Sequence, residues 1–167
     1  MGNNTQNEAK DDQPGELTIT RVFDAPRERV WRAWTDPEQL KLWHGPQGFT
    51  APVIQNDLRV GGRHLYCMRG PDGKDYWSTG TYREVVPQER IVATDSFADP
   101  AGNVVPASYY GMPGDWELEL ELTATFEERD GKTRLTLHHT GFPASMDAGE
   151  AHTGWEQSLD KLAAALK

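Results

Sequence analysis

The chain has 167 residues, a length that favours one domain with a hydrophobic core of its own. Its 26 acidic and 17 basic residues give a net charge of −9. This balance argues against nucleic acid and against an anionic membrane surface as partners, because both attract clustered Lys and Arg. The one cysteine, Cys67, excludes an internal disulfide and any site that needs several cysteines.

The first residues differ in composition from the rest of the chain. Residues 1–15 are almost free of apolar side chains, and we expect them to form a disordered leader before a domain over 16–167. No apolar stretch reaches the length of a membrane span, and the start of the chain lacks the hydrophobic region of a signal peptide. We therefore expect a cytoplasmic protein.

One strand and two short helices are predicted near the start of the domain. Apolar and polar residues alternate over 17–23, which indicates a strand. Pro26 suits the first position of a helix expected over 27–34, with Asp24 or Ala25 as its cap. Asp36 and Pro37 then suit the N-cap and first position of a second helix that ends at Leu42.

Six more strands and a long helix follow. Turn-forming Gly, Pro and Asp residues separate most of the strands, which we expect over residues 50–57, 63–69, 76–86, 91–97, 116–129 and 133–141. Segment 98–115 is too long for a tight turn, and we expect an ordered flap over one end of the sheet. The last helix is predicted to begin near Asp147, and it carries an apolar stripe that must be buried: Trp155, Leu159, Leu162 and Leu166.

The last two strands show which side of the sheet is apolar. Leu118, Leu120, Leu122, Ala124 and Phe126 alternate with polar residues, as in a sheet covered on one side only. The same alternation places His139 on the apolar face and His138 on the solvent face. These two histidines therefore cannot share a metal ion, and the sequence has no phosphate-binding glycine loop. We expect neither a metal nor another cofactor.

The element order β-α-α-β-β-β-β-β-β-α and several motifs carry a resemblance to a known family. The motifs include RVFDAP at 21–26, VWRAWTDP at 30–37, LWHGP at 42–46, DLRVGG at 57–62, MRGPDG at 68–73, YREVVP at 82–87 and GWEQSLDKL at 154–162. The chain resembles the START/Bet v-like (SRPBCC) superfamily, and within it the bacterial homologues of the activator of heat-shock protein 90 ATPase. The resemblance implies an α+β helix-grip fold, in which a curved antiparallel sheet wraps around a long C-terminal helix. It also implies a cavity between the sheet and that helix.

We expect aromatic, methionine and histidine side chains to line this cavity, because binding pockets combine apolar walls with a few polar groups. Ordinary core packing is the alternative for these residues. Asp95 and Arg83 are further candidates, but the alternation of their strands does not decide which way they face. The candidate ligand-binding residues are His64, Tyr66, Met68, Trp77, Tyr82, Phe97, Tyr109, Tyr110, Met112, Trp116, His139, His152 and Trp155.

Three functions remain open at this point. The favoured hypothesis is binding of a small apolar or aromatic, lipid-like ligand by a monomer or weak homodimer, with His139 or a tyrosine hydroxyl orienting the ligand. The second is an interaction module that activates a chaperone ATPase, for which the row Glu117, Glu119 and Glu121 is a candidate docking surface. The third is a cyclase- or hydrolase-type enzyme with His139 as acid or base, which requires a second polar group within reach of that histidine. We assign no catalytic residue.

Overall fold

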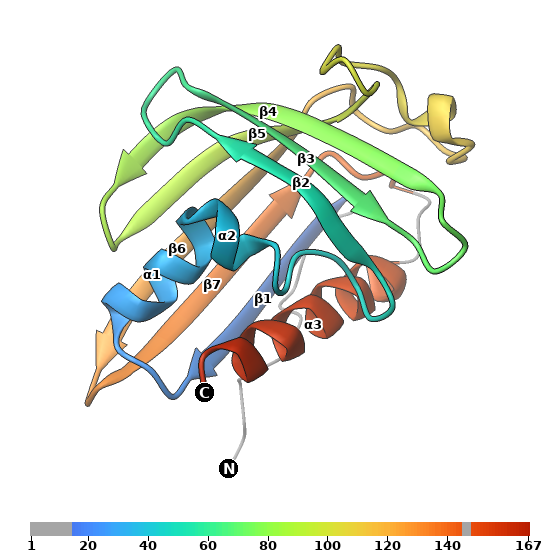
Figure 1. The fold of residues 1–167 in the computed structure, drawn as a ribbon. Helices are drawn as coiled ribbons and strands as arrows, with labels where there is room; N and C mark the ends of the chain where they lie inside the picture. Colours follow the sequence, from blue (N-terminus) through green and yellow to red (C-terminus); the bar gives the residue numbers. More distant parts are fainter. Residues whose placement is uncertain (1–14, 145–147) are drawn as a thin grey trace.

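A curved antiparallel sheet lies against one long helix in the computed structural model (Figure 1). The structure describes residues 15–144 and 148–167, so the predicted leader lies outside the described residues except for Gly15. The seven strands follow the order β1-β7-β6-β5-β4-β3-β2 across the sheet. The strands are β1 (Glu16–Phe23), β2 (Thr50–Asn56), β3 (Arg63–Arg69), β4 (Asp75–Val86), β5 (Arg90–Ala98), β6 (Leu120–Arg129) and β7 (Lys132–Thr140). This is the predicted helix-grip α+β fold.

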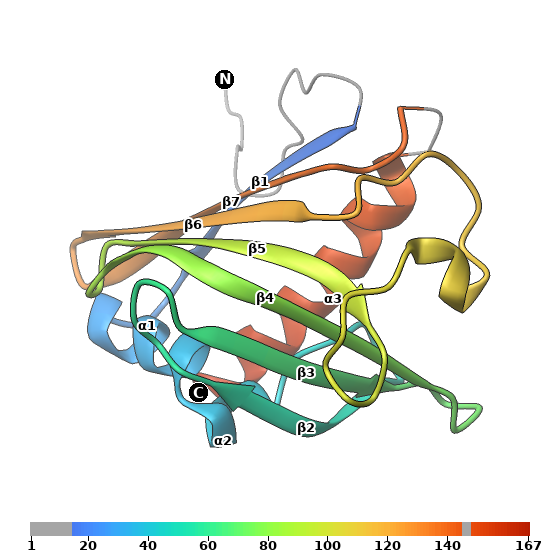
Figure 2. The same ribbon diagram turned by 90° about the horizontal axis from the view of Figure 1, so that it is seen from above.

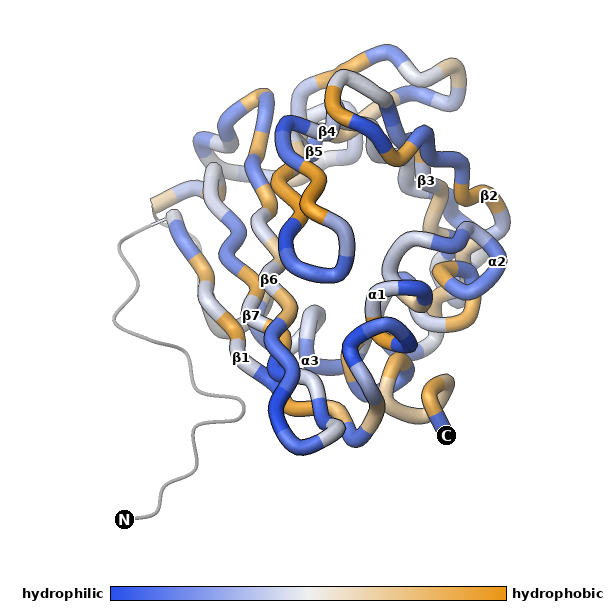
Figure 3. The backbone as a smooth tube through the Cα atoms, turned by 90° about the vertical axis from the view of Figure 1, so that its left-hand side faces the viewer, coloured by the Kyte–Doolittle hydropathy of each residue, from blue (hydrophilic) through white to orange (hydrophobic). Residues whose placement is uncertain are grey.

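The helices lie on the concave side of the sheet. Helix α3 (Ala148–Ala165) crosses the sheet, and the short helices α1 (Arg27–Thr35) and α2 (Pro37–Leu40) form a corner near its C-terminal end (Figure 1). Seen along the strands, the sheet curls so that its edge strands β1 and β2 come round toward these helices (Figure 3). In the described part of the chain, no helix is long and apolar enough to cross a membrane.

The apolar stripe of α3 is buried as its spacing predicts. Leu159 and Leu162 are fully buried, and Trp155 and Leu166 pack partly buried against the same core. At the corner, the Asp36 side chain accepts a hydrogen bond from the backbone of Glu38 and caps α2, and Pro37 is the first residue of that helix. Helix α2 ends at Leu40, two residues before the predicted end.

Strand β6 is shorter than predicted. It begins at Leu120 rather than at Trp116, and Leu118, which was predicted to face the apolar side, is 56% exposed. The ladder between β6 and β7 ends at the pair Glu121 and Thr140. Gly141 then has a left-handed backbone with φ of +106°, where the regular ladder ends. Residues 116–119 lie beside it outside the strand, and the Glu117 N–H donates to the Gly141 carbonyl over 2.9 Å.

The predicted flap follows β5 and lies at one end of the sheet (Figure 2). It contains one short 3-10 helix, η1 (Ala107–Tyr110). The Tyr110 hydroxyl donates to the carbonyl of Ala98 over 2.5 Å and accepts the backbone N–H of Trp77 over 3.1 Å. One side chain therefore ties the segment to both β4 and β5.

Candidate functional site

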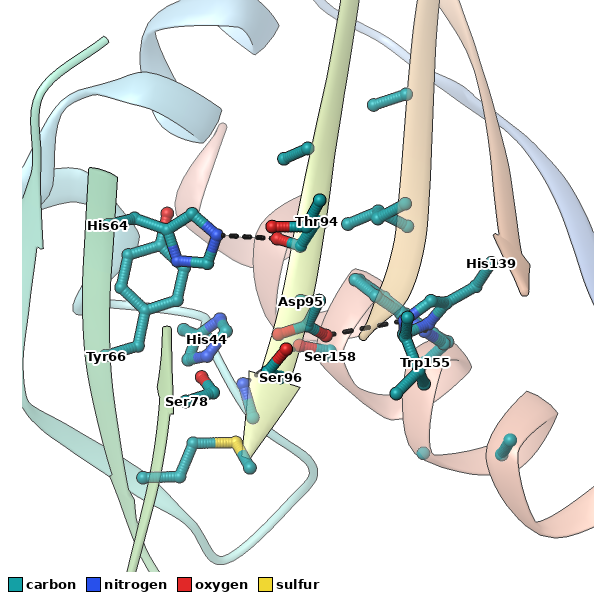
Figure 4. Close-up of a pocket in the computed structure, with 18 of the residues that line it drawn as sticks. His44, His64, Tyr66, Ser78, Thr94, Asp95, Ser96, His139, Trp155 and Ser158 are labelled. Carbon is teal, nitrogen blue, oxygen red and sulfur yellow. Dashed lines mark hydrogen bonds and ion pairs between the residues drawn. The ribbon is translucent and has the colours of Figure 1, made fainter. Parts of the chain in front are cut away.

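A cavity of about 360 Å³ lies between the sheet and α3, and its walls are mainly apolar. This volume falls within the range of small-molecule pockets in proteins. Nine of the predicted site residues line it: His64, Tyr66, Met68, Tyr82, Phe97, Met112, Trp116, His139 and Trp155. Figure 4 shows His44, His64 and Tyr66 on one side of the cavity and Asp95, His139 and Trp155 on the other.

Four predicted site residues are not among those that line the cavity. Trp77 precedes Ser78, which does line it, so alternation along β4 points Trp77 to the outer face. Tyr109 is 55% exposed, and the Tyr110 hydroxyl is occupied by backbone groups of β4 and β5. His152 lies next to Glu156 on α3, with 3.7 Å between Nδ1 and Oε2.

The two undecided residues face opposite ways. Asp95 on β5 lines the cavity. Arg83 on β4 lies outside it, with its guanidinium 2.8 Å from Glu119 and 3.8 Å from Glu121. The strand of Asp95 could not be oriented from its sequence because residues 91–94 are all buried and do not alternate.

His64 is held by a hydrogen bond across the sheet. Its Nε2 lies 3.0 Å from the carbonyl oxygen of Thr94, and because a carbonyl only accepts, Nε2 carries the proton. Nδ1 is then an acceptor, and it is buried without a hydrogen-bond partner among the described residues. Burial lowers the pKa of His64, so this imidazole is neutral near pH 7.

A glycine makes this arrangement possible. A Cβ atom at Gly80 would lie 1.8 Å from the Thr94 carbonyl oxygen and 2.6 Å from the His64 Nε2. The regular pairing of β4 with β5 is also interrupted at Gly80 and Thr81, and the Thr81 N–H bonds to the Thr94 hydroxyl instead. The absent side chain thus leaves room for the imidazole to reach the backbone of β5.

His44 is a cavity residue that the sequence did not predict. It lies in the loop between α2 and β2, where no periodicity indicates the direction of a side chain. Its ring packs edge-on against Tyr66, with the ring centroids 4.9 Å apart. Burial lowers the pKa of His44 to about 4, outweighing the opposite effect of Asp95.

Helix α3 holds the loop that carries His44. The Ser158 hydroxyl accepts the Gly45 N–H over 3.1 Å and donates to the Trp43 carbonyl over 2.9 Å. One turn later, the Lys161 ammonium donates to three carbonyl oxygens, at 3.0, 3.3 and 3.2 Å; these belong to Gly45, Pro46 and Phe49. Helix α3 therefore forms one wall of the cavity and also fixes the loop that carries His44.

His139 connects the opposite wall to α3. The Trp155 indole N–H donates to His139 Nδ1 over 3.2 Å, so the imidazole proton lies on Nε2. That nitrogen is 3.4 Å from Asp95 Oδ2, a close contact whose alignment is too poor for a full hydrogen bond. Burial tends to raise the pKa of the Asp95 carboxyl, but His139, His64 and His44 together outweigh it and hold that pKa below its usual value.

Two tyrosine hydroxyls add polar groups to the wall formed by β3 and β4. Tyr66 and Tyr82 have their hydroxyl oxygens 3.4 Å apart, and the Asn56 amide donates to Tyr82 over 3.4 Å. Burial raises the pKa of both tyrosines, so both remain protonated donors near neutral pH. In the described part of the chain, no three His, Cys, Asp or Glu side chains are placed to hold a metal ion together.

Comparisons with known proteins give the family. Residues 24–167 match the family model of the activator of Hsp90 ATPase homolog 1-like proteins. A comparison with curated proteins gives no match.

Solved structures of bacterial proteins share this fold over most of the chain. A protein from Chromobacterium violaceum is 34% identical, with 92% of this chain and 98% of that protein covered and a TM-score of 0.77. A protein from Mycobacterium smegmatis is 33% identical, with coverages of 95% and 93% and a TM-score of 0.72. The AHSA1 protein from Silicibacter pomeroyi is 26% identical, with coverages of 90% and 96% and a TM-score of 0.70. Family and fold together support a domain of ligand-binding type. The chain belongs to the activator of Hsp90 ATPase homolog 1-like family.

Proposed function

We propose that the protein binds one small, largely apolar or aromatic ligand in the cavity between the sheet and α3. The observation that carries the proposal is the cavity itself, about 360 Å³ in volume with mainly apolar walls. Closely packed protein cores have few voids larger than a water molecule, so a hollow of this size is a specific feature of the fold. The few polar groups on its walls would orient the guest.

His139 is better suited to hold the wall together than to transfer protons. Its Nδ1 accepts the Trp155 indole, and its Nε2–H is directed toward Asp95. The second polar group that an enzyme would require is therefore present, but Nδ1, the only nitrogen of this tautomer that can accept a proton, is occupied by the indole N–H. Acid–base catalysis by this residue stays a prediction with less support than binding.

Activation of a chaperone ATPase also stays a prediction. The row of glutamates suggested for docking lies beside Arg83, which forms ion pairs with Glu119 and Glu121. The side chains of Arg83, Glu119 and Glu121 are all about half exposed, as expected for ion pairs on a solvated surface.

A cavity-filling variant tests the proposed function. Ala124 on β6 is 1% exposed and lines the cavity, so Ala124→Phe should place a ring in that space. Ala101, exposed in the flap, provides the control Ala101→Phe. The readouts are native mass spectrometry for a co-purified small molecule and fluorescence titration with the neutral probe N-phenyl-1-naphthylamine.

We expect the wild type and Ala101→Phe to bind the probe and Ala124→Phe to bind it at least about tenfold more weakly. A ligand that binds only the folded state also raises the melting temperature, which gives a second readout for a broad panel of lipids and aromatics. Equal probe binding by all three proteins would place the probe outside the cavity and contradict the proposal.

A further inference from the structure

The cavity contains a carboxylate with few partners. Asp95 lines the wall formed by β5, and the 30% of its side chain that remains accessible faces the cavity. Among the described residues, none makes a well-aligned hydrogen bond to its carboxylate, and the His139 Nε2 lies 3.4 Å from its Oδ2. A carboxylate that is largely withdrawn from water and lacks well-aligned hydrogen bonds is costly, so this group favours a partner from outside the protein.

His139 does not neutralise the carboxylate. An indole N–H can only donate, and Trp155 directs it at His139 Nδ1. A positively charged imidazolium would carry a proton on that same nitrogen and place two N–H groups against each other. The hydrogen bond therefore favours the neutral form of His139, and the charge of Asp95 remains.

The other nearby bases do not supply the missing positive charge. Of the described residues that line the cavity, none is a lysine or an arginine. The Lys161 ammonium lies near the loop that carries His44, and it donates hydrogen bonds to three backbone carbonyl oxygens. Burial lowers the pKa of both His44 and His64, which keeps these two imidazoles neutral.

The surrounding walls are suited to a cation with an apolar body. Trp34 and Trp155 lie nearly parallel, with ring centroids 6.1 Å apart and an interplanar angle of 9°, and both line the cavity. Tyr66 and Trp43 add further aromatic surface. Aromatic faces attract cations, and the attraction grows when the site is shielded from water.

We propose that the ligand is an organic cation, a protonated amine or amidinium on an aromatic or aliphatic body, whose N–H groups bind the Asp95 carboxylate. This inference rests on the proposed function, because it specifies the chemistry of the guest in the same cavity. His44 is a second contact: it lines the cavity, and no described residue hydrogen-bonds its ring nitrogens.

Three probes of similar size and different charge test the inference. They are the cation 2-naphthylmethylamine, the neutral 2-naphthylmethanol and the anion 2-naphthoate, titrated calorimetrically near pH 7. Asp95→Asn removes the charge and keeps an oxygen that can accept from His139. The control Glu121→Gln removes a carboxylate from the neighbouring strand β6, where Glu121 lies 45% exposed beside Arg83 on the outer face.

For the wild type and Glu121→Gln, we expect the amine to bind about 10- to 100-fold more tightly than the alcohol, the usual effect of one hydrogen bond to a charged group. In Asp95→Asn the amine should fall to the level of the alcohol. If the wild type binds the alcohol or the naphthoate as tightly as the amine or more tightly, the ligand is not selected as a cation. The proposal that the cavity binds a ligand would still stand. A preference for the amine that persists in Asp95→Asn would overturn the role of Asp95. Binding of none of the three probes would contradict both proposals.

Discussion

The Trp155 indole N–H donates to His139 Nδ1 over 3.2 Å, so a residue of α3 selects the tautomer of a residue of β7. The selected tautomer directs its Nε2–H toward Asp95, 3.4 Å away. Three residues from a helix and two strands thus form one series of polar contacts inside a mainly apolar cavity. The indole of Trp155 sets the orientation of both contacts, because an indole N–H can only donate and so fixes which nitrogen of His139 carries the proton.

Trp155→Phe should release that selection. Phenylalanine keeps most of the ring packing but has no N–H, so His139 should lose its bias toward the Nε2–H tautomer. Long-range ¹⁵N–¹H NMR spectra of the imidazole measure the tautomer directly. Trp116→Phe is the matched control, because Trp116 also lines the cavity but donates its indole N–H to the Pro113 carbonyl. An unchanged His139 spectrum in Trp155→Phe would contradict this account.

His44 should make the protein less stable in mild acid. Its pKa is about 4 in the folded protein and about 6.5 when unperturbed, so below pH 6.5 the unfolded chain takes up a proton that the folded protein does not. The free energy of unfolding should therefore fall between pH 6.5 and 4, by up to about 3 kcal/mol from this group. Burial also lowers the pKa of His64, which acts in the same direction. The depressed pKa of Asp95 acts separately, because its stabilising effect is lost only below its ordinary value of 3.8.

Urea unfolding curves between pH 7 and 4 measure how the free energy of unfolding changes with pH in the wild type and in His44→Phe. Phenylalanine does not titrate and suits an apolar wall, so the variant should lose less stability on acidification. The remaining slope should come from His64 and the other titrating groups. A variant that loses as much stability as the wild type would show that His44 is not responsible.

The fold could be predicted because the apolar residues of its helices and strands recur at regular spacings. The spacing of Leu159 and Leu162 predicted the buried face of α3, and alternation along β7 predicted that His139 faces inward, where the structure places it. These patterns repeat over several residues, so one exception does not change the result. Where a pattern reaches the end of an element it fails, as at Leu118, which continues the alternation of β6 beyond the last paired residue.

The polar part of the site depends on contacts between distant segments, which local patterns do not contain. His44 faces the cavity because Ser158 and Lys161, more than a hundred residues later, hold its loop. Asp95 belongs to a strand that is buried on both sides at residues 91–94, so no alternation indicates its direction. Trp77 was predicted to line the cavity because it is aromatic, although no pattern indicated which face of the sheet it occupies. In the structure its side chain lies on the outer face of β4.

Gly80→Ala should destabilise the protein strongly. The new Cβ would meet the Thr94 carbonyl oxygen at 1.8 Å and the His64 Nε2 at 2.6 Å, so either the strand or the imidazole must move. We expect a loss of at least about 1–3 kcal/mol in the free energy of unfolding, the usual cost of overpacking. Gly154→Ala is the matched control, because its Cβ meets only Pro46 at 3.8 Å and alanine favours the helix; it should gain about 0.5–1 kcal/mol. Equal stability of the two variants in urea would contradict the crowding at Gly80.

Lys161→Met tests whether α3 fixes the loop that carries His44. The methionine keeps much of the side-chain volume, but the three carbonyl oxygens of residues 45, 46 and 49 lose their donor. Loss of hydrogen bonds to a charged donor in a partly buried site should cost about 1–3 kcal/mol. Lys41→Met is the control, because Lys41 makes an exposed ion pair with Glu38, and its loss should cost less than about 0.5 kcal/mol.

Hydrogen exchange then separates a local effect from a global one. The amides of residues 44–49 should lose more protection in Lys161→Met than those of β6 and β7. Uniform loss over the whole sheet would mean that Lys161 stabilises the fold in general rather than this loop.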